Sequence, residues 1–498
     1  MKVSIDWIKD FTTVPDSKAQ EIASNFTLRT AEVEGVETKF SHLANIVVVE
    51  VLEKNKHPDA EKLSLVTFTD GKTKRQVVCG APNVKVGMKT AYAPLGTCFP
   101  DGLVLEPKKI RGVLSEGMLC SEEELGTSAE SSGIIELKAD AILGQKIADH
   151  LKIKTDVILD IDNKSLTHRP DLWGHLGMAR EFASIYGHPL KNIYSTDSWR
   201  SKITSHFNSK KSPIIPTLEG TSAARIYLGL SVDQVTVGES PEWMKRRLEA
   251  VGLRSINNIV DISNYVMLEL GHPLHIFDRD KIAQNKIVVK KLGREANFLT
   301  LDEVERALIA SDTVICDANQ PLVIAGLMGG KSSGVTETTK NIFIEVANWQ
   351  AALVRQTSTR LGLRTDSSQR FEKTLDDQFC ETVMLRALEL VLQLCPKAQV
   401  VGKIETASAV TFPKPLTIET SLKNINRLLG LTLEESRLVS IFESLEFKVK
   451  KSGETLHVTV PSFRATKDIE IEEDLVEEVG RIIGYGNITP TSPLLSVK

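Results

Sequence analysis

The sequence predicts a multidomain α+β protein. Its 498 residues are enough for roughly three or more domains, each with its own core. Short β-forming runs follow one another from residue 46 to about residue 120, whereas helical spacing of apolar residues recurs elsewhere in the chain. The composition, 41% hydrophobic and 25% charged, is that of an ordinary globular protein.

Charge and cysteine content exclude several classes of protein. The net charge of -4 argues against a protein that holds nucleic acid by bulk charge, although local basic faces remain open. The six cysteines form no CxxC pair, so neither a zinc ribbon nor a disulfide framework is predicted. Asp6 and Asp10 stand where a signal peptide needs an apolar core, and no apolar run approaches membrane-spanning length. We therefore expect a soluble cytoplasmic protein with reduced cysteines.

The N-terminal elements begin with a strand at residues 3–5 and a helix over residues 17–28, capped by Asp16 or Ser17. From residue 46, the runs IVVVEVLEK, LSLVTFTDG, RQVVCG and KTAYAPLG are separated by turn signals. Several strands within about a hundred residues predict a small antiparallel barrel. Apolar residues then recur at helical spacing over residues 171–186.

The C-terminal elements follow residues 194–212, which are rich in Ser, Lys and Asn and are predicted to be a linker. A large mixed segment runs from residue 213 to about 394. A smaller α/β unit comes next, with a helix over residues 432–445 and a strand at residues 456–460. An acidic helix is predicted over residues 469–484.

The most informative stretch is residues 257–278, NNIVDISNYVMLELGHPLHIFD. It places Asn264 and His275 on either side of an apolar run, and Gly271 and Pro273 force a turn before the histidine. An apolar wall, an amide and an imidazole on a turn are the parts of a pocket that binds or hydrolyses a small group. From these residues alone, a helix packed on a turn is the simpler interpretation.

A glycine-rich loop, AGLMGGKS at residues 325–332, nearly matches the phosphate-binding pattern GxxxxGK[ST]. That pattern needs a helix directly afterwards, and Ser333, Gly334, Val335 and Thr336 are poor helix formers. The loop is therefore predicted to be a glycine turn beside a pocket and not a nucleotide site.

Basic and acidic clusters each have two interpretations. On the predicted barrel, a lysine-rich face could follow a phosphate backbone or simply be solvated; its residues are Lys54, Lys56, Lys72, Lys74, Arg75, Lys108, Lys109 and Arg111. The turn at His57 is expected to cap structure and not to bind a metal. In the acidic helix, Asp474, Glu477 and Glu478 share one side, so a cation would relieve their repulsion, although a solvated helix is the default.

Taken together, the ordered motifs resemble the beta subunits of bacterial phenylalanine–tRNA ligase. The blocks HPDAEKLSLVTFTDG, VVCGAPNV and IRGVLSEGMLCSEEELG resemble the tRNA-binding barrel of that family. VDISNYVMLELGHPLHIFD, AGLMGGKSSGV, IFIEVA and GLRTDSSQRFE are similar to its editing domain, in order. THRPDLWGHLGMARE and PSFRATKDIEIEEDLVEEVGRIIGYGNI are similar to the segments that follow the barrel and precede the catalytic-like domain.

The resemblance implies a domain order. It comprises a small α/β N-terminal domain (1–38 and 151–193), an inserted OB-fold tRNA-binding barrel (39–150), a mixed α/β editing domain (213–395), a small winged-helix-like α/β domain (400–475) and the start of a class II catalytic-like domain (476–498).

The resemblance also implies a proofreading activity. An apolar pocket for phenylalanine rejects tyrosine only about a hundredfold, so a second site hydrolyses Tyr-tRNA(Phe). By this resemblance, Glu345 accepts the tyrosine hydroxyl, and Gly326, Thr365 and Ser367 shape the pocket. His275, Ser263 and Asn264 position water near the ester. Because no nucleophile is evident, we expect direct attack by water.

Partners and cofactors follow from the same resemblance. The family assembles two alpha and two beta subunits, and the alpha subunit uses ATP to attach phenylalanine to tRNA(Phe). A Mg²⁺ site shared with alpha is expected at Asp468, Asp474, Glu477 and Glu478. RNA contacts are expected at Lys54, Lys56, Lys108, Lys109 and Arg111, and neither a membrane nor DNA is an expected partner.

Two departures from the family keep other functions open. Relatives continue for several hundred residues past the position of Lys498, so a truncated subunit is expected. Ser367 and Ser263 stand where relatives often carry alanine and threonine. A free-standing hydrolase of Tyr-tRNA(Phe), or a tRNA- or partner-binding module with an inactive pocket, are the alternatives.

Overall fold

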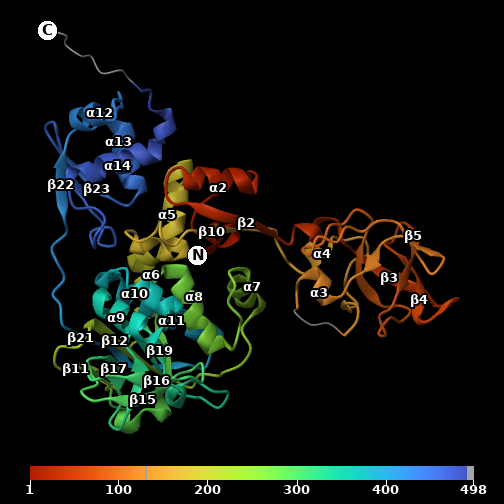
Figure 1. Ribbon diagram of the computed structural model, residues 1–498, viewed down its shortest axis with the longest axis horizontal. Coiled ribbons are helices and arrows are strands. Elements are labelled where there is room, and N and C mark those ends of the chain that lie inside the picture. The colour runs from red at the N-terminus through yellow and green to blue at the C-terminus, as the bar shows by residue number, and fades with distance from the viewer. Residues whose placement is uncertain (129–131, 491–498) are drawn as a thin grey trace. The chain divides into compact units, whose positions relative to one another are not determined.

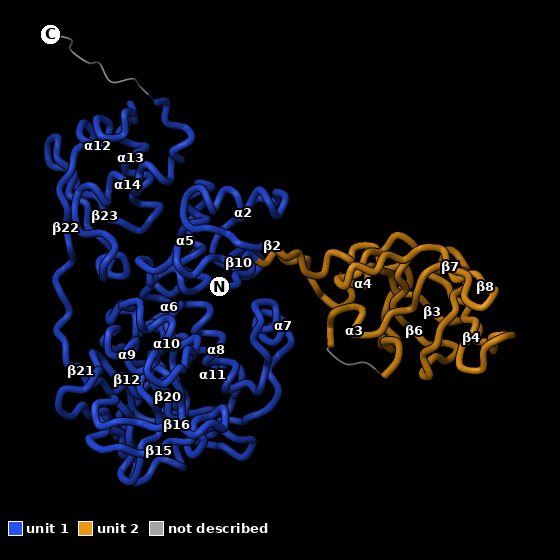
Figure 2. The backbone as a smooth tube through the Cα atoms, viewed as in Figure 1, with its two compact units in different colours: residues 1–36, 159–498 blue, residues 37–158 orange. Residues whose placement is uncertain are grey.

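The computed structural model describes residues 1–128 and 132–490. The chain divides into two compact units, one made of residues 1–36 and 159–498 and the other of residues 37–158 (Figure 2). The smaller unit is therefore an insertion between two segments of the larger one.

The smaller unit is built on an antiparallel sheet with the strand order β5-β4-β3-β6-β9. Its strands are β3 (Val47–His57), β4 (Ala60–Thr69), β5 (Lys74–Cys79), β6 (Lys89–Ala93) and β9 (Met118–Leu119). The remaining elements are β7 (Lys108–Ile110), β8 (Val113–Ser115), α3 (Glu122–Leu125), α4 (Ile147–His150) and the 3-10 turn η1 (Ser41–Asn45) (Figure 1). Successive residues of β3 face two different cores, Val48 one and Val49 the other, as the pleat requires.

The predicted closed barrel is not found among the described residues, because the edge strands β5 and β9 do not pair. Only a bond from the Glu116 amide to the Gln76 carbonyl (3.2 Å) and one from the Val78 amide to Ser115 Oγ (3.1 Å) bridge the gap. The chain bends at Gly117, where φ is 123° and a Cβ would come within 2.4 Å of the Ala93 carbonyl oxygen. After this bend, Met118 and Leu119 pair with β6 and not with β5.

The larger unit begins with a three-stranded sheet in the order β1-β10-β2. Its elements are β1 (Lys2–Ser4), β2 (Val33–Lys39), β10 (Asp156–Ile161), α1 (Ile5–Ile8), α2 (Ala19–Thr27), η2 (Pro170–Trp173) and α5 (His175–Tyr186). Helix α5 is buried along most of its length, and its His175 ring stacks on Trp7 with centroids 4.1 Å apart. The strand and the two helices predicted here are confirmed, with ends shifted by a few residues. The predicted cap of α2 at Asp16 or Ser17 is wrong, because the helix begins after Lys18 and has no side-chain cap bond.

The prediction of a linker over residues 194–212 is wrong. The segment contains η3 (Ile193–Ser195) and α6 (Asp197–Thr204), and α6 packs against α11 (Cys380–Leu394). Trp199 and Ile203 are buried and lie four residues apart, which places both on one helical face. The polar composition of the segment hid this narrow apolar stripe.

The central part of the larger unit contains two antiparallel-rich sheets. The first has the order β13-β20-β12-β21, with β12 (Ala224–Asp233), β13 (His275–Asp278), β20 (Ile342–Trp349) and β21 (Gln399–Ser408). The second has the order β11-β14-β17-β18-β19, with β11 (Thr217–Leu218), β14 (Val288–Lys291), β17 (Thr313–Cys316), β18 (Pro321–Ile324) and β19 (Met328–Gly329).

Helices and short elements surround these sheets. They are α7 (Glu242–Ala250), α8 (Asn258–Leu270), α9 (Ala351–Leu361), α10 (Asp366–Phe371), the hairpin β15 (Ala296–Leu299) and β16 (Glu305–Leu308), and the 3-10 turns η4 (Arg279–Lys281), η5 (Ala283–Asn285), η6 (Lys331–Ser333) and η7 (Asp377–Phe379). Helix α11 contacts β20 and β12 of the first sheet. One core unites the two sheets, with Tyr227 and Phe343 from the first and Val314 and Ile324 from the second.

The C-terminal part is a three-stranded antiparallel sheet with three helices. Its elements are β22 (Thr417–Thr420), β23 (Lys448–Ser452), β24 (Thr455–Thr459), α12 (Leu422–Leu429), α13 (Glu435–Ser444), α14 (Glu472–Ile483) and η8 (Tyr485–Asn487). The predicted boundary between residues 475 and 476 falls inside α14. Because Val479 and Ile482 share a core with Leu438 and Val458, α14 belongs whole to this part.

Candidate functional site

A cavity of about 520 Å³ lies between α8, β13, β20 and the loop that follows β18. The seven residues predicted to form the editing pocket all line it: Ser263, Asn264, His275, Gly326, Glu345, Thr365 and Ser367. Apolar side chains such as Met267, Trp349 and Phe371 complete the wall. A mostly apolar cavity with a few convergent polar groups is the usual form of a small-molecule site.

Local signals in the sequence fix the wall made by α8. The Asn257 side chain accepts hydrogen bonds from the amides of Ile259 (3.1 Å) and Val260 (3.0 Å), which caps the helix. The helix ends at Gly271, whose φ of 77° is the left-handed conformation that glycine adopts freely. Between these ends, Val260, Ser263, Asn264 and Met267 have i, i+3, i+4, i+7 spacing and line the cavity together.

His275 and Glu345 form the polar centre of the cavity, directly opposite each other in the antiparallel ladder of β13 and β20. Burial lowers the pKa of His275 to about 4 and raises the pKa of Glu345 to about 8. At pH 7 the imidazole is therefore neutral and the carboxyl is mostly protonated. Among the described residues, His275 Nε2 and Glu345 Oε2 are buried atoms without a hydrogen-bond partner.

Two glycines lack the side chains that would otherwise fill the space of the neighbouring pocket residues. A Cβ on Gly329 would lie 2.7 Å from His275 Cε1, so a larger residue there would displace the imidazole. At Gly326 φ is 71°, and a Cβ would lie 3.0 Å from Trp349 Cδ1. The glycine-rich loop therefore lies beside the pocket, and the 3-10 turn η6 follows it instead of an α-helix.

The serine and threonine hydroxyls around the cavity bond to backbone groups, and not to a side chain that could act as a base. Thr365 Oγ1 donates to the Leu327 carbonyl (2.9 Å) and accepts from the Ser368 amide (3.0 Å), which ties α10 to the glycine loop. Ser263 Oγ donates to the Val260 carbonyl (2.6 Å). Within the described residues, no lining serine or threonine contacts an imidazole or a carboxylate, so the arrangement favours chemistry by water over a side-chain nucleophile.

In the smaller unit, most of the predicted RNA-binding residues gather near one end of β3. Lys56 on β3, Lys108 and Lys109 on β7, and Arg111 are exposed. His57 joins these segments, since its Nδ1 accepts from the Asp59 amide and its Nε2 therefore donates to the Ile110 carbonyl (3.1 Å). Lys54 differs from the others, because its Nζ donates to the Val84 carbonyl (2.8 Å).

The four carboxylates predicted to hold magnesium do not converge. Glu478 accepts from Arg464 Nη1 (2.8 Å) and Arg481 Nε (2.7 Å), and Asp468 is paired with Arg464. Asp474 accepts from the amides of Glu470 and Ile471, and Glu477 is exposed. Across residues 1–128 and 132–490, no group of three or more such side chains is placed to hold a metal. As the structure describes them, these four residues do not fit a divalent cation, because buried arginines already pair with two of the four carboxylates.

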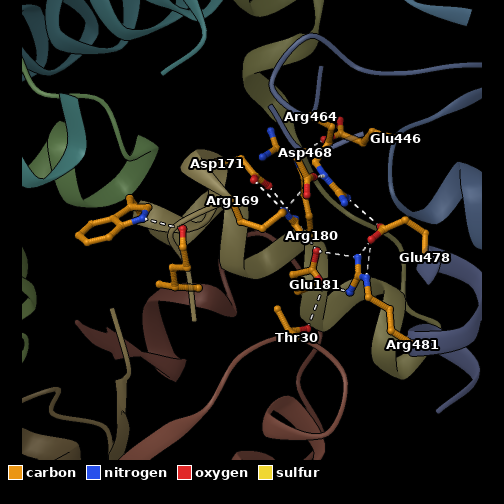
Figure 3. A network of polar contacts seen from close by, with 12 residues as sticks. Thr30, Arg169, Asp171, Arg180, Glu181, Glu446, Arg464, Asp468, Glu478 and Arg481 are labelled. Carbon is orange, nitrogen blue, oxygen red and sulfur yellow. Dashed lines mark hydrogen bonds and ion pairs between the residues drawn. The ribbon is translucent and has the colours of Figure 1, made fainter. Parts of the chain in front are cut away.

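Those arginines belong to a buried network that joins two long motifs (Figure 3). Arg169 lies just before α5 and Glu181 lies on it. They meet Arg464 and Arg481 from the C-terminal part, and three carboxylates lie between these groups: Asp171, Asp468 and Glu478. Burial alone would raise the pKa of Glu181, but Arg481 and Arg169 hold it below its ordinary value. Sequence reasoning missed this network, because its members lie far apart along the chain.

Comparisons with known proteins agree with this arrangement. The B3/4 domain family matches residues 223–396, the tRNA synthetase B5 domain family matches residues 418–485, and a tRNA binding domain family matches residues 46–146. The described residues contain no helix that is both long and apolar enough to cross a bilayer.

Curated relatives match nearly the whole chain. The phenylalanine–tRNA ligase beta subunit of Geobacter metallireducens is 41% identical over 99% of this chain, and that of Solibacter usitatus is 40% identical over 99%. The chain spans 60% and 61% of the lengths of these two relatives. Among solved structures, an N-terminal fragment of the phenylalanyl-tRNA synthetase beta subunit from Pyrococcus horikoshii is 19% identical, with a TM-score of 0.34, over 66% of this chain and 88% of that one.

Proposed function

Since the chain belongs to the family of phenylalanine–tRNA ligase beta subunits, we propose that its cavity hydrolyses mischarged Tyr-tRNA(Phe). We also propose that the chain acts within the ligase that attaches phenylalanine to tRNA(Phe). The position of Glu345 is the observation that carries the hydrolytic part of this proposal.

Glu345 supplies the selectivity that the reaction needs. Its side chain is 5% exposed, and Oε2 has no hydrogen-bond partner in the described structure. A tyrosine side chain would bring a hydroxyl to this carboxyl, whereas phenylalanine would leave the side of the carboxyl that faces the cavity unpaired in an apolar wall. Leaving a buried polar group without a partner costs about 1–3 kcal/mol, so the pocket favours tyrosine over phenylalanine.

His275 and Asn264 support the attack of water on the ester. Water adds to the ester carbonyl, the bond to the ribose oxygen breaks, and the proton that water loses ends on that oxygen. A neutral imidazole can accept a hydrogen bond from the attacking water at pH 7, which a protonated one cannot. The low pKa of His275 keeps it in this neutral form. The amide of Asn264 lines the same cavity and would orient the water or the ester.

The ligase context supplies the other partners. We assign tRNA contact to four exposed basic residues: Lys56, Lys108, Lys109 and Arg111. We assign the consumption of ATP to the alpha subunit. The assembly would contain two alpha and two beta subunits and act in the cytoplasm. Any magnesium site would need ligands beyond this chain, because Asp468 and Glu478 are held by arginines. No step is assigned to a metal on these residues.

Deacylation assays test the proposal directly. The purified chain, incubated with Tyr-tRNA(Phe) and separately with Phe-tRNA(Phe), should release tyrosine well above the buffer rate and phenylalanine far more slowly. His275→Ala should slow tyrosine release about 100-fold or more. Glu345→Ala should remove the preference for tyrosine. Binding of tRNA without tyrosine release would instead identify a binding module.

Membership of the ligase needs a separate assay. Co-expression with an alpha subunit from a close relative should yield a complex that charges tRNA(Phe). A chain that deacylates Tyr-tRNA(Phe) but never assembles would be a free-standing hydrolase.

A further inference from the structure

The buried phenol of Tyr227 lies on the core side of the Glu345 carboxyl. Tyr227 on β12 pairs with Ala347 on β20, and Gly229 pairs with Glu345. Residues two apart on a strand face the same side of the sheet, so Tyr227 and Glu345 are diagonal neighbours on one face. Tyr227 does not line the cavity, which places it on the core side of Glu345.

The surroundings of the Tyr227 ring are apolar and offer its hydroxyl few hydrogen-bond partners. The side chain is fully buried and shares a core with Phe277 and Phe343. Gly229 lets the Phe343 ring cross the strand at this point, since a Cβ there would lie 2.3 Å from Phe343 Cζ. The ring is thereby confined, and a phenylalanine would fill the same space without a polar atom to satisfy.

The hydroxyl and the carboxyl act on each other. Burial raises the pKa of the Tyr227 phenol, and the nearby Glu345 raises it further. Burial raises the pKa of Glu345, and the Tyr227 hydroxyl lowers it in part. Among the described residues, neither Tyr227 Oη nor Glu345 Oε2 makes a hydrogen bond of good geometry. The two groups therefore influence each other's pKa without a well-formed hydrogen bond between them.

We propose that Tyr227 is a positioning residue that holds one oxygen of Glu345 from behind, so that the other oxygen faces the hydroxyl of a bound tyrosine. This inference rests on the proposed function and deepens it. A carboxyl has two oxygens and rotates about its last bond, so it discriminates well only if one oxygen is fixed elsewhere. The Tyr227 hydroxyl is the fixed point on the core side, and a ligand hydroxyl is the partner on the cavity side.

The Tyr227→Phe variant tests the proposal, because it removes only the hydroxyl. The ratio of kcat/KM for Tyr-tRNA(Phe) to that for Phe-tRNA(Phe) should fall about tenfold, the loss of one well-placed hydrogen bond. The loss should appear as a higher KM for Tyr-tRNA(Phe) with kcat nearly unchanged. Tyr265→Phe is the matched control, since its hydroxyl is also buried but bonds Arg247 Nη1 (2.8 Å) outside the pocket. An unchanged ratio in Tyr227→Phe, or an equal fall in Tyr265→Phe, overturns the proposal.

A second measurement keeps the test independent of catalysis. The carboxyl stretch of Glu345, isolated as an infrared difference against Glu345→Gln, reports its titration. Among the described residues, the other ionisable side chains that line the cavity are His275 on β13, directly opposite Glu345, and Asp366 at the start of α10. Tyr227→Phe should move the titration to higher pH, and a fluorinated tyrosine at 227, a stronger donor of unchanged shape, should move it lower. Shifts without any tyrosine release would support the Tyr227–Glu345 contact while defeating the hydrolase. No shift in either variant would defeat the contact.

Discussion

Gly329 and His275 touch across two sheets, because a Cβ on the glycine would lie 2.7 Å from Cε1 of the imidazole. Gly329 belongs to the short strand β19, and His275 begins β13 in the other sheet. The absence of a side chain at one residue therefore sets the position of the imidazole at the other.

Gly329→Ala should displace the His275 ring while leaving the fold intact, since a ring at the edge of a cavity can move. A misplacement of about 1 Å can cost a hundredfold in rate, so we expect deacylation of Tyr-tRNA(Phe) to slow about 10- to 100-fold. Single-turnover kinetics and the urea midpoint of unfolding are the measurements. Gly486→Ala is the control, because a Cβ there meets nothing within 4 Å. Equal rates for the two variants would contradict this account of Gly329.

Glu345 should make stability fall as the pH rises. Its pKa is about 8 in the folded chain and 4.5 ordinarily, so between these values the folded state keeps a proton that the unfolded state has released. The free energy of unfolding therefore loses on the order of 5 kcal/mol from pH 4.5 to above pH 8. His275 acts oppositely below pH 6.5, since its pKa of about 4 makes stability rise from pH 4 to 6.5.

Glu345→Gln separates these two effects, because it removes the carboxyl titration and keeps the histidine. Urea unfolding at pH 5.5 and pH 8.5 should show that the unmodified chain loses more stability over this interval than the variant does. Parallel losses would mean that Glu345 is already ionised in the folded state.

Short-range signals predicted the wall of the pocket well. Gly271, Pro273 and the apolar run before them are local signals, so the sequence alone predicts a helix here and the turn before His275. The diagonal placement of Tyr227 and Glu345 could not be found in this way. It depends on the register of β12 against β20, and nothing local in either strand fixes which residues face each other.

Two features of the structure depend on contacts that the sequence does not reveal. The spacing of Asp474, Glu477 and Glu478 correctly implies one helical side, but it does not show that Arg464 and Arg481 meet Glu478 there. The strand runs of the smaller unit likewise predict an antiparallel sheet, while closure depends on how the chain bends at Gly117. In both cases the missing information is a contact between distant segments.

Breaking the buried ion network should be costly. Glu181 accepts from Arg169 Nη2 (2.7 Å) and from both terminal nitrogens of Arg481, and its side chain is fully buried (Figure 3). Glu181→Gln leaves buried positive charge uncompensated, so we expect a loss of about 3–5 kcal/mol in the free energy of unfolding. Glu435→Gln breaks the exposed pair with Lys451 and should cost less than about 1 kcal/mol. Urea denaturation of both variants at one pH measures the difference, and similar costs would contradict a stabilising role for the network.

The basic residues of the smaller unit should contribute to tRNA binding according to whether their ammonium groups already bond to the fold. Lys56 and Lys109 are exposed and carry no structural bond in the described chain, whereas Lys54 is tied to the Val84 carbonyl. A lysine that neutralises a phosphate releases a counterion, so Lys56→Gln and Lys109→Gln should each weaken binding of tRNA(Phe) and reduce the slope of log K against log salt by about one. Lys54→Gln should change the slope much less, because its ammonium group already serves the fold. Titrations of the full chain with tRNA(Phe) between about 50 and 200 mM salt supply both numbers. An unaltered slope in the Lys56 and Lys109 variants would leave a solvated lysine-rich surface as the account of this face.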